Sequence, residues 1–255
     1  MEGEEKGGDA GMRIKYVGNA GVIIETDETC IGIDCFCRDE FEIYPDLSIE
    51  DKESLFEMIE TGKLKLLIFT HEHSDHFYAG DVKAACEKNS DLKVLAGQKV
   101  IDLLYKERIP PKQLITIEPP RSVSEGRLEI TFIKTEHDGD QYADVENLTL
   151  LINIGTNTIV VTGDAKPSEA LFTKISDWSK KVDLFIAPFP YVGLQTARKQ
   201  MVKHLDVREI VATHEPRPEK DTMGWLKSTE KVCAQANEGL PTPIFSKKKK
   251  EWHCL

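Results

Sequence analysis

Three of the seven histidines in this chain lie within six consecutive residues, together with two carboxylates. The segment reads His71-Glu72-His73-Ser74-Asp75-His76, and it follows the mostly apolar residues 65–69. That apolar run predicts a buried strand, and on an extended chain side chains two residues apart face the same way. His71 and His73 can therefore face one ion, while Asp75 and His76 can face a second ion beside it. Crowded imidazoles repel one another when protonated, and a divalent cation relieves this repulsion, so the cluster predicts a metal site.

Taken one at a time, the same residues have ordinary structural interpretations. Asp75 suits the N-cap of a following helix, Glu72 suits a solvated position, and a lone histidine is commonly a partly buried polar residue. Four ligand-type side chains at the end of one strand favour the metal interpretation over these alternatives.

The elements that must position the cluster alternate along the chain. Strands are predicted at residues 13–17, 22–25, 30–34, 65–69, 93–96, 114–117, 128–134, 148–154, 159–162, 184–187 and 209–212. Helices are predicted from about Ser48 to Gly62, around 82–86, and at 100–105, 167–176, 195–204 and 221–237. Each half contains hairpins followed by strand and helix alternation. This order predicts an α/β fold in which two mixed β-sheets pack face to face, with helices on both outer faces (an αββα sandwich).

Length and composition limit the class of protein. A chain of 255 residues, 40% hydrophobic and 30% charged, is expected to be globular, with residues 1–11 as a disordered leader and 12–255 as a single domain. The net charge of −11 argues against nucleic acid or anionic membrane as partners, because both bind lysine and arginine. We therefore expect a small-molecule substrate, and the sequence leaves a homo-oligomer open.

The six cysteines lack the spacing of a disulfide framework, and neither a signal peptide nor a membrane span is visible. We accordingly expect reduced thiols and a cytoplasmic protein. Cys35 and Cys37 are interpreted as small buried residues, with a redox or third-metal role as the alternative. Residues 247–250, four consecutive lysines, are interpreted as a solvated tail.

The pattern His-x-His-x-Asp-His after a buried strand resembles the hallmark of the metallo-β-lactamase superfamily, and it matches without substitution. The resemblance extends over nearly the whole chain from Met12. The further matching segments are Gly18-Asn19-Ala20-Gly21, Ile31-Gly32-Ile33-Asp34, Val160-Val161-Thr162-Gly163-Asp164 and Ile210-Val211-Ala212-Thr213-His214. The resemblance implies the metallo-β-lactamase fold.

The same resemblance implies a site for two metal ions. It assigns His71, His73 and His137 to one ion, Asp75, His76 and His214 to the other, and Asp164 as the bridge. The family pattern requires a histidine before the Thr-Gly-Asp segment, and His137 is the only one between His76 and His204. Taken alone, Asp164 also suits a helix cap and His214 a loop histidine, whereas His204 and His253 are interpreted as non-ligands. Two divalent ions are expected, Zn²⁺ first, with Mn²⁺ or Fe as alternatives.

The implied activity is metal-dependent hydrolysis. A metal-bridging hydroxide is expected to attack an ester, lactone or phosphoester of a small, optionally phosphorylated metabolite, while Asp75 orients that nucleophile and relays its proton. The length and the absence of a large insertion resemble the ascorbate-phosphate lactonase-like branch. Alternatives are a di-iron redox protein of the same fold, an RNA or DNA phosphodiesterase and a non-catalytic binding module.

Two segments are expected to supply the wall of the substrate pocket. The residues concerned are Asp138, Asp140, Gln141 and Tyr142 after His137, and Phe189, Tyr191, Gln195 and Arg198 further along. Arg198 would either receive a phosphate or carboxylate or lie on a solvated helix face.

Overall fold

The computed structural model describes residues 12–235, 239–248 and 253–254, so the leader predicted for residues 1–11 lies outside the described residues. One sheet of the described chain has the strand order β14-β1-β2-β3-β4-β5-β6. Its strands are β1 (Arg13–Val17), β2 (Gly21–Glu25), β3 (Cys30–Ile33), β4 (Leu64–Phe69), β5 (Lys93–Ala96), β6 (Leu114–Thr116) and β14 (His253–Cys254). Strands β1 to β3 pair antiparallel as a meander, and β3 to β6 pair parallel.

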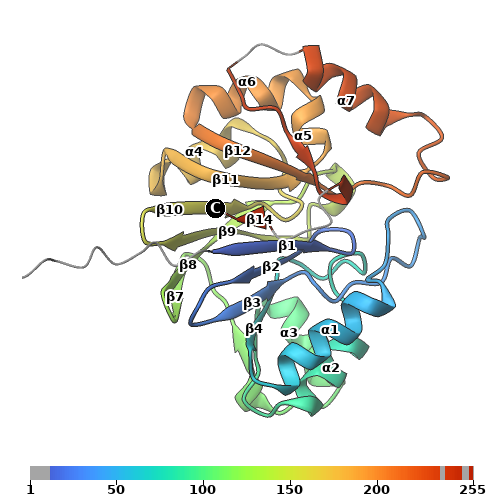
Figure 1. The fold of residues 1–255 in the computed structure, drawn as a ribbon, viewed down its shortest axis with the longest axis vertical. Helices are drawn as coiled ribbons and strands as arrows, with labels where there is room; N and C mark the ends of the chain where they lie inside the picture. Colours follow the sequence, from blue (N-terminus) through green and yellow to red (C-terminus); the bar gives the residue numbers. More distant parts are fainter. Residues whose placement is uncertain (1–11, 236–238, 249–252, 255) are drawn as a thin grey trace, which may run out of the picture.

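Helices connect the parallel strands of this sheet and cover its outer face (Figure 1). They are α1 (Ile49–Glu60), α2 (Ala79–Lys88) and α3 (Gln98–Lys106), followed by the short 3₁₀ helix η1 (Pro111–Gln113). Helix α1 begins where expected because the Ser48 side chain accepts a hydrogen bond from the Asp51 backbone N–H.

The second sheet has the order β13-β12-β11-β10-β9-β8-β7. Its strands are β7 (Arg121–Glu125), β8 (Leu128–Glu136), β9 (Glu146–Ile154), β10 (Asn157–Val161), β11 (Lys181–Pro188), β12 (Asp206–Thr213) and β13 (Ile244–Phe245). On its outer face lie α4 (Glu169–Trp178), α5 (Pro190–Gly193), α6 (Gln195–His204) and α7 (Trp225–Gln235), and η2 (Asp140–Tyr142) and η3 (Ser246–Lys248) lie in loops. Strands β10, β11 and β12 are parallel, so their carboxyl ends meet at one edge.

Alternation along the strands fills three apolar layers. Ile24 and Ile68 point between the two sheets, whereas Ile23 and Leu67, one residue earlier on the same strands, point toward helices α1 to α3. A third layer lies between the second sheet and its helices. Because both faces of each sheet are covered, its central strands are apolar on both sides, and the predicted αββα sandwich is confirmed.

Three strands and one helix were not expected from the sequence. Strand β7 carries a single apolar residue, Val123, because it is an edge strand, and β13, β14 and α5 are too short to show a period. Helix α7 begins at Trp225 rather than 221, because Asp221 accepts hydrogen bonds from the N–H groups of Trp225 and Leu226. None of the helices in the described ranges has the length and apolarity needed to cross a bilayer.

At the first lysine of the solvated tail predicted for residues 247–250, the side chain is exposed but hydrogen-bonded. The Lys247 ammonium donates hydrogen bonds to the carbonyl oxygens of Glu215 and Pro216, so it is anchored to the loop that follows β12. Residues 249 and 250 lie outside the described part of the chain.

Candidate metal centre

The predicted ligands lie where strands of both sheets end. His71 follows β4, His137 follows β8, Asp164 follows β10 and His214 follows β12. The carboxyl edges of two sheets that pack face to face bring these loops together, although they are up to 143 residues apart in sequence (His71 to His214, 214 − 71).

Two groups of ligand-type atoms form at this edge. One contains His71, His73, His137 and Asp164, the other contains Asp75, His76, Asp164 and His214, and within each group the atoms lie within 4.8 Å of one another. The structure therefore brings together all seven residues in the two groups that the resemblance implied. Their role as ligands stays a prediction.

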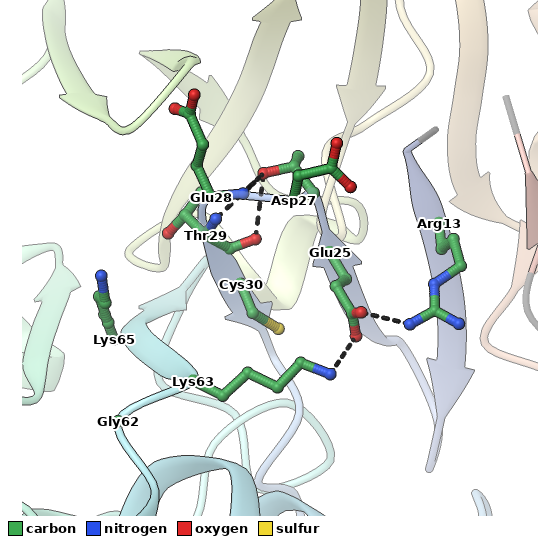
Figure 2. Close-up of a pocket in the computed structure, with 10 residues that line it drawn as sticks. Arg13, Glu25, Asp27, Glu28, Thr29, Cys30, Gly62, Lys63 and Lys65 are labelled. Atoms are coloured by element: carbon green, nitrogen blue, oxygen red, sulfur yellow. Dashed lines mark hydrogen bonds and ion pairs between the residues drawn. The ribbon is translucent and has the colours of Figure 1, made fainter. Parts of the chain in front are cut away.

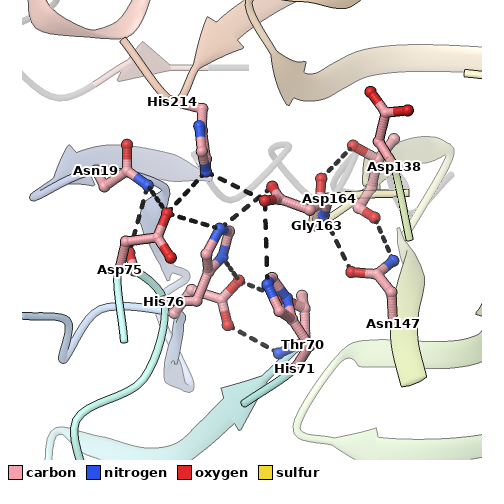
Figure 3. Close-up of polar contacts among 12 residues, drawn as sticks. Asn19, Thr70, His71, Asp75, His76, Asp138, Asn147, Gly163, Asp164 and His214 are labelled. Carbon is pink, nitrogen blue, oxygen red and sulfur yellow. Dashed lines mark hydrogen bonds and ion pairs between the residues drawn. The ribbon is translucent and has the colours of Figure 1, made fainter. Parts of the chain in front are cut away.

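Asp164 lies between the two groups. Its Oδ2 atom is 3.2 Å from Nε2 of His214, 3.7 Å from Nε2 of His137 and 4.0 Å from Nε2 of His71, and its Oδ1 atom is 3.2 Å from Nε2 of His76. Figure 3 shows the imidazoles of His71, His76 and His214 directed toward this carboxylate. Oδ2 thus faces imidazoles of both groups and Oδ1 faces the second group, so this carboxylate is placed to act as a ligand that two ions share.

Hydrogen bonds from residues behind the centre orient the imidazoles. Asp34 accepts from the Thr70 hydroxyl at 2.6 Å, so the Thr70 oxygen is left to accept from Nδ1 of His71 at 3.0 Å. Asp34 also bonds Nδ1 of His76 at 2.9 Å, and the Asp138 carbonyl accepts from Nδ1 of His137 at 2.6 Å. With Nδ1 donating, each Nε2 atom is left facing the centre, where its neutral form offers a lone pair to an ion.

This arrangement fits a metal better than a set of hydrogen bonds. Among the described residues, no hydrogen-bond partner is found for the buried Nε2 atoms of His71 and His137, and those of His76 and His214 meet only the carboxylates of Asp164 and Asp75, at 2.9–3.2 Å. Leaving buried polar atoms unsatisfied is costly, and imidazole and carboxylate are the ligands that divalent transition metals accept.

The electrostatics point the same way. Burial is the largest influence on His71 and lowers the pKa of its imidazole well below the usual value. Burial also lowers the pKa of His76 and His214, but Asp164 and Asp75 outweigh it, so that the pKa of His76 is well raised and that of His214 reaches about 9. These imidazoles hold protons that compensate the two carboxylates, and a divalent ion can take over that compensation.

Three of the simpler interpretations are wrong. Helix α2 has Tyr78 at its N-cap, so Asp75 is not a cap; its Oδ2 atom instead accepts from the Asn19 amide at 3.0 Å. Helix α4 is capped by Ser168, so Asp164 is not a cap either. Glu72 is not simply solvated, because its carboxylate pairs with the Lys99 ammonium at 3.1 Å.

A cavity of about 480 Å³ opens over the centre. Asp138, Tyr142 and Tyr191 line it as predicted, whereas Asp140, Gln141, Phe189 and Gln195 do not. Arg198 was also placed wrongly: it is buried and lines a separate small pocket with Val192 and Cys233, because α6 turns that side chain under α7.

Sequence reasoning missed part of this wall. The missed apolar residues are Phe41, Ile43, Tyr44, Pro188 and Pro190. Phe41 and Ile43 lie in a loop without periodicity, and their only signal was apolar character among acidic neighbours. The rings of Tyr44 and Tyr142 pack edge-on against ligand imidazoles, at centroid distances of 4.0 Å from His214 and 4.8 Å from His73.

Two cysteines and one further histidine lie as the sequence predicted. Cys35 and Cys37 are buried as expected, and burial raises the pKa of the Cys37 thiol to about 11. His204 lies on α6, 3.6 Å from Glu169, and belongs to neither group of ligand-type residues.

A larger cavity of about 560 Å³ lies at the opposite, amino ends of β3 and β4 (Figure 2). Its wall carries Glu25, which pairs with Arg13 and, at 2.9 Å, with Lys63. No imidazole is among its lining residues, and the two cations nearest Glu25 are already paired with it. The smaller cavity is therefore the candidate site, because convergent ligand-type atoms rather than size mark a site.

Comparison with known proteins agrees with this geometry. Residues 48–223 match the family described as Beta-lactamase superfamily domain. The UPF0173 protein PF0020 of Pyrococcus furiosus is 28% identical over 177 residues, which cover 69% of this chain and 70% of that protein.

Two solved structures share the fold. Igni18, a metallo hydrolase from Ignicoccus hospitalis, has a TM-score of 0.64 and 16% identity over 96% of this chain and 98% of its own. CmlA, a diiron beta-hydroxylase from Streptomyces venezuelae, has a TM-score of 0.67 and 13% identity over 96% of this chain and 54% of its own. At these identities the likeness shows the fold alone.

Proposed function

The chain belongs to the beta-lactamase superfamily, and we propose that it is a dinuclear metal-dependent hydrolase that cleaves an ester or lactone bond of a small molecule. The single observation that supports this most is the pair of ligand groups that share Asp164 at the floor of an open cavity. Zn²⁺ is the first choice for both positions, with Mn²⁺ or Fe as alternatives.

His71, His73 and His137 would hold one ion, Asp75, His76 and His214 the other, and Asp164 both. Bound there, two divalent ions would lower the pKa of a water between them to about 7 and polarise the substrate carbonyl.

The protein's own groups then have separate tasks. The Asp75 carboxylate lines the cavity and is fixed by the Asn19 amide at 3.0 Å, so it can orient an attacking water and hold its proton. Tyr44 and Tyr142 stand on two sides of the centre and restrict where a substrate can enter. Burial of the ligand imidazoles limits competing water and strengthens each electrostatic contact.

The proposal is tested by reloading purified protein with Zn²⁺ or Mn²⁺ and assaying a panel of esters, lactones and phosphodiesters. Turnover is expected on at least one ester or lactone, and Asp75→Ala should abolish it because the water loses its orienting carboxylate. His204→Ala is the matched control, since that histidine lies outside both groups and should leave turnover intact. Inactivity of the reloaded protein on the whole panel would refute the proposal.

A di-iron redox protein is the second candidate, favoured by the shared fold of the CmlA hydroxylase. Elemental analysis separates the two: bound iron with a visible-range chromophore would favour redox chemistry, and colourless zinc or manganese protein would favour hydrolysis.

A further inference from the structure

The wall of the cavity at the metal centre is apolar and acidic, and we propose that the substrate is an uncharged ester or lactone that carries an apolar group. This inference rests on the proposed function and names the substrate class of the same site. Among the described residues, those that line the cavity include no lysine and no arginine. Apart from the imidazoles assigned to the metal ions, this wall therefore offers no basic side chain to a phosphate or carboxylate away from the reacting bond.

One side of the cavity is formed by residues 39–44, which we call the apolar loop because its side chains Phe41, Ile43 and Tyr44 line the opening. Phe41 is 75% exposed and Ile43 is 41% exposed, and both line the opening together with Tyr44. Exposed apolar side chains gathered at a cavity usually mark a surface that binds apolar groups.

The loop is fixed in this position by its own carboxylate. Asp39 is buried, and its two oxygens accept hydrogen bonds from the backbone N–H groups of Phe41 at 3.0 Å and Tyr44 at 2.6 Å. Arg217 adds a hydrogen bond of 2.8 Å to the Tyr44 carbonyl. Asp39 thus shapes the wall, and its oxygens are occupied by the loop.

Four other residues of the wall are also uncharged. They are Tyr142, Tyr191, Pro188 and Pro190, and none of them carries a charge at neutral pH. Burial raises the pKa of the Tyr191 phenol well above its usual value, so this side chain is neutral throughout the working range. An acyl chain in contact with these residues and the apolar loop would remove apolar surface from water.

The basic residues of the neighbouring segments are engaged elsewhere. Arg38 donates a hydrogen bond to the Tyr78 hydroxyl at 3.2 Å and lies over that ring. Lys166 lies 3.6 Å from Glu136 and 3.7 Å from Asp140. Neither lines the cavity, so neither is placed to receive an anionic group.

Asp138 adds a negative charge to the wall. Its side chain is exposed, and only its Oδ1 atom accepts a hydrogen bond, from the Gly139 N–H at 3.0 Å. A carboxylate or phosphate on the non-reacting part of a substrate would be repelled by this group. The wall thus selects against anions as well as for apolar groups, and the phosphorylated metabolite that the sequence left open does not suit it.

The test compares two esters that differ in one terminal group. p-Nitrophenyl valerate and mono-p-nitrophenyl glutarate share a leaving group and have acyl chains of similar length, but only the second ends in a carboxylate. With the Zn²⁺- or Mn²⁺-loaded protein, and after correction for spontaneous hydrolysis, kcat/KM should be at least ~10-fold higher for the valerate. Equal or faster turnover of the glutarate would overturn the inference.

Variants of the loop check that the wall is responsible. Ile43→Lys places a cation in the wall and should reverse or abolish the preference for the valerate, while Ile43→Ala should lower kcat/KM for the valerate more than for p-nitrophenyl acetate. Ile49→Ala is the control, because Ile49 is 78% exposed and lies outside the cavity. If Ile43→Lys keeps the full preference, the wall does not set the substrate class.

A binding measurement separates failure of this inference from failure of the proposed function. The anilides of valeric acid and of glutaric acid cannot be hydrolysed readily, so their affinity for the metal-loaded protein is measured by calorimetry. Tighter binding of the valeric anilide supports the inference even if no ester is turned over, in which case the proposed hydrolysis alone fails. Tighter binding of the glutaric anilide overturns the inference whether or not turnover occurs.

Discussion

Oδ2 of Asp34 lies 2.9 Å from Nδ1 of His76, while both oxygens of the same buried carboxylate accept hydrogen bonds from Thr70, one from its backbone N–H at 2.8 Å and one from its hydroxyl at 2.6 Å. The Thr70 hydroxyl in turn bonds Nδ1 of His71. Asp34 therefore orients one imidazole in each ligand group, although it belongs to neither group itself. The two groups are therefore coupled behind the centre as well as through Asp164 in front of it.

We expect Asp34→Asn to weaken metal binding by roughly 10- to 100-fold, because loss of the charge and of one acceptor frees both imidazoles to rotate. Titration against a chromophoric chelator measures the change. Asp183→Asn is the matched control: Asp183 is equally buried and accepts a hydrogen bond from Thr158 N–H at 2.9 Å, but far from the centre. An equal loss of metal affinity in the control would mean that the effect is general destabilisation.

Substitution of Asp164, which both ligand groups share, should lower the metal content more than substitution of a residue that belongs to one group. Asp164→Ala is expected to lower the content of both ions, because Asp164 belongs to both ligand groups. His73→Ala should lower only the content of the ion in its own group. Elemental analysis after gel filtration gives both values, and full metal content in Asp164→Ala would contradict a bridging role.

The C-terminal segment should stabilise the loop that carries His214. Glu215 is buried directly after it, and its carboxylate accepts from the Ser246 hydroxyl at 3.1 Å and the Lys247 backbone N–H at 2.9 Å. Glu215→Ala leaves these donors without an acceptor, so the free energy of unfolding should fall by about 1–3 kcal/mol. Urea unfolding measures this.

Metal titration of the same variant should show weaker binding only in the group that contains His214. Glu215→Gln keeps an acceptor oxygen and should retain most of the stability and the affinity. A loss of affinity at the other group in Glu215→Ala would show that the effect spreads beyond this loop.

The ion pairs in the second cavity predict a pH dependence of stability. Burial alone would raise the pKa of Glu25, but Lys63 and Arg13 outweigh it, so the folded-state pKa is depressed. The contribution is therefore present above the unfolded pKa of about 4.3 and is lost as the pH falls through the folded value. Since these side chains are partly exposed, its size should be within about 1 kcal/mol.

Unfolding of the wild type and of Glu25→Gln at two pH values checks this sign. The wild type should be the more stable at pH 7, and the difference should shrink toward zero below about pH 4. Glu57→Gln, at an exposed position on α1, should show no such trend. A difference that grows as the pH falls would contradict the assignment.

Residues close in sequence were predicted well because their geometry is local. The spacing of His71, His73, Asp75 and His76 decides which side chains share a direction, and alternation of apolar residues decides which faces of a strand are buried. The same reasoning found the helix that starts after Ser48, since a cap is a contact over three residues. Local patterns therefore determined the αββα layering and the cluster from His71 to His76, whereas His137, Asp164 and His214 were implied only by the family resemblance.

The tertiary structure decided what surrounds them. Asp34 and Asn19 support the centre, Arg198 is turned under α7 instead of toward the substrate, and the loop with Phe41 becomes a wall. Each of these depends on packing between segments far apart in the chain, where neither periodicity nor local hydrogen bonding carries a signal. The sequence on its own thus determined which groups can do chemistry here, and only the folded chain decided what they can act on, because the shape and charge of a cavity arise from contacts between distant loops.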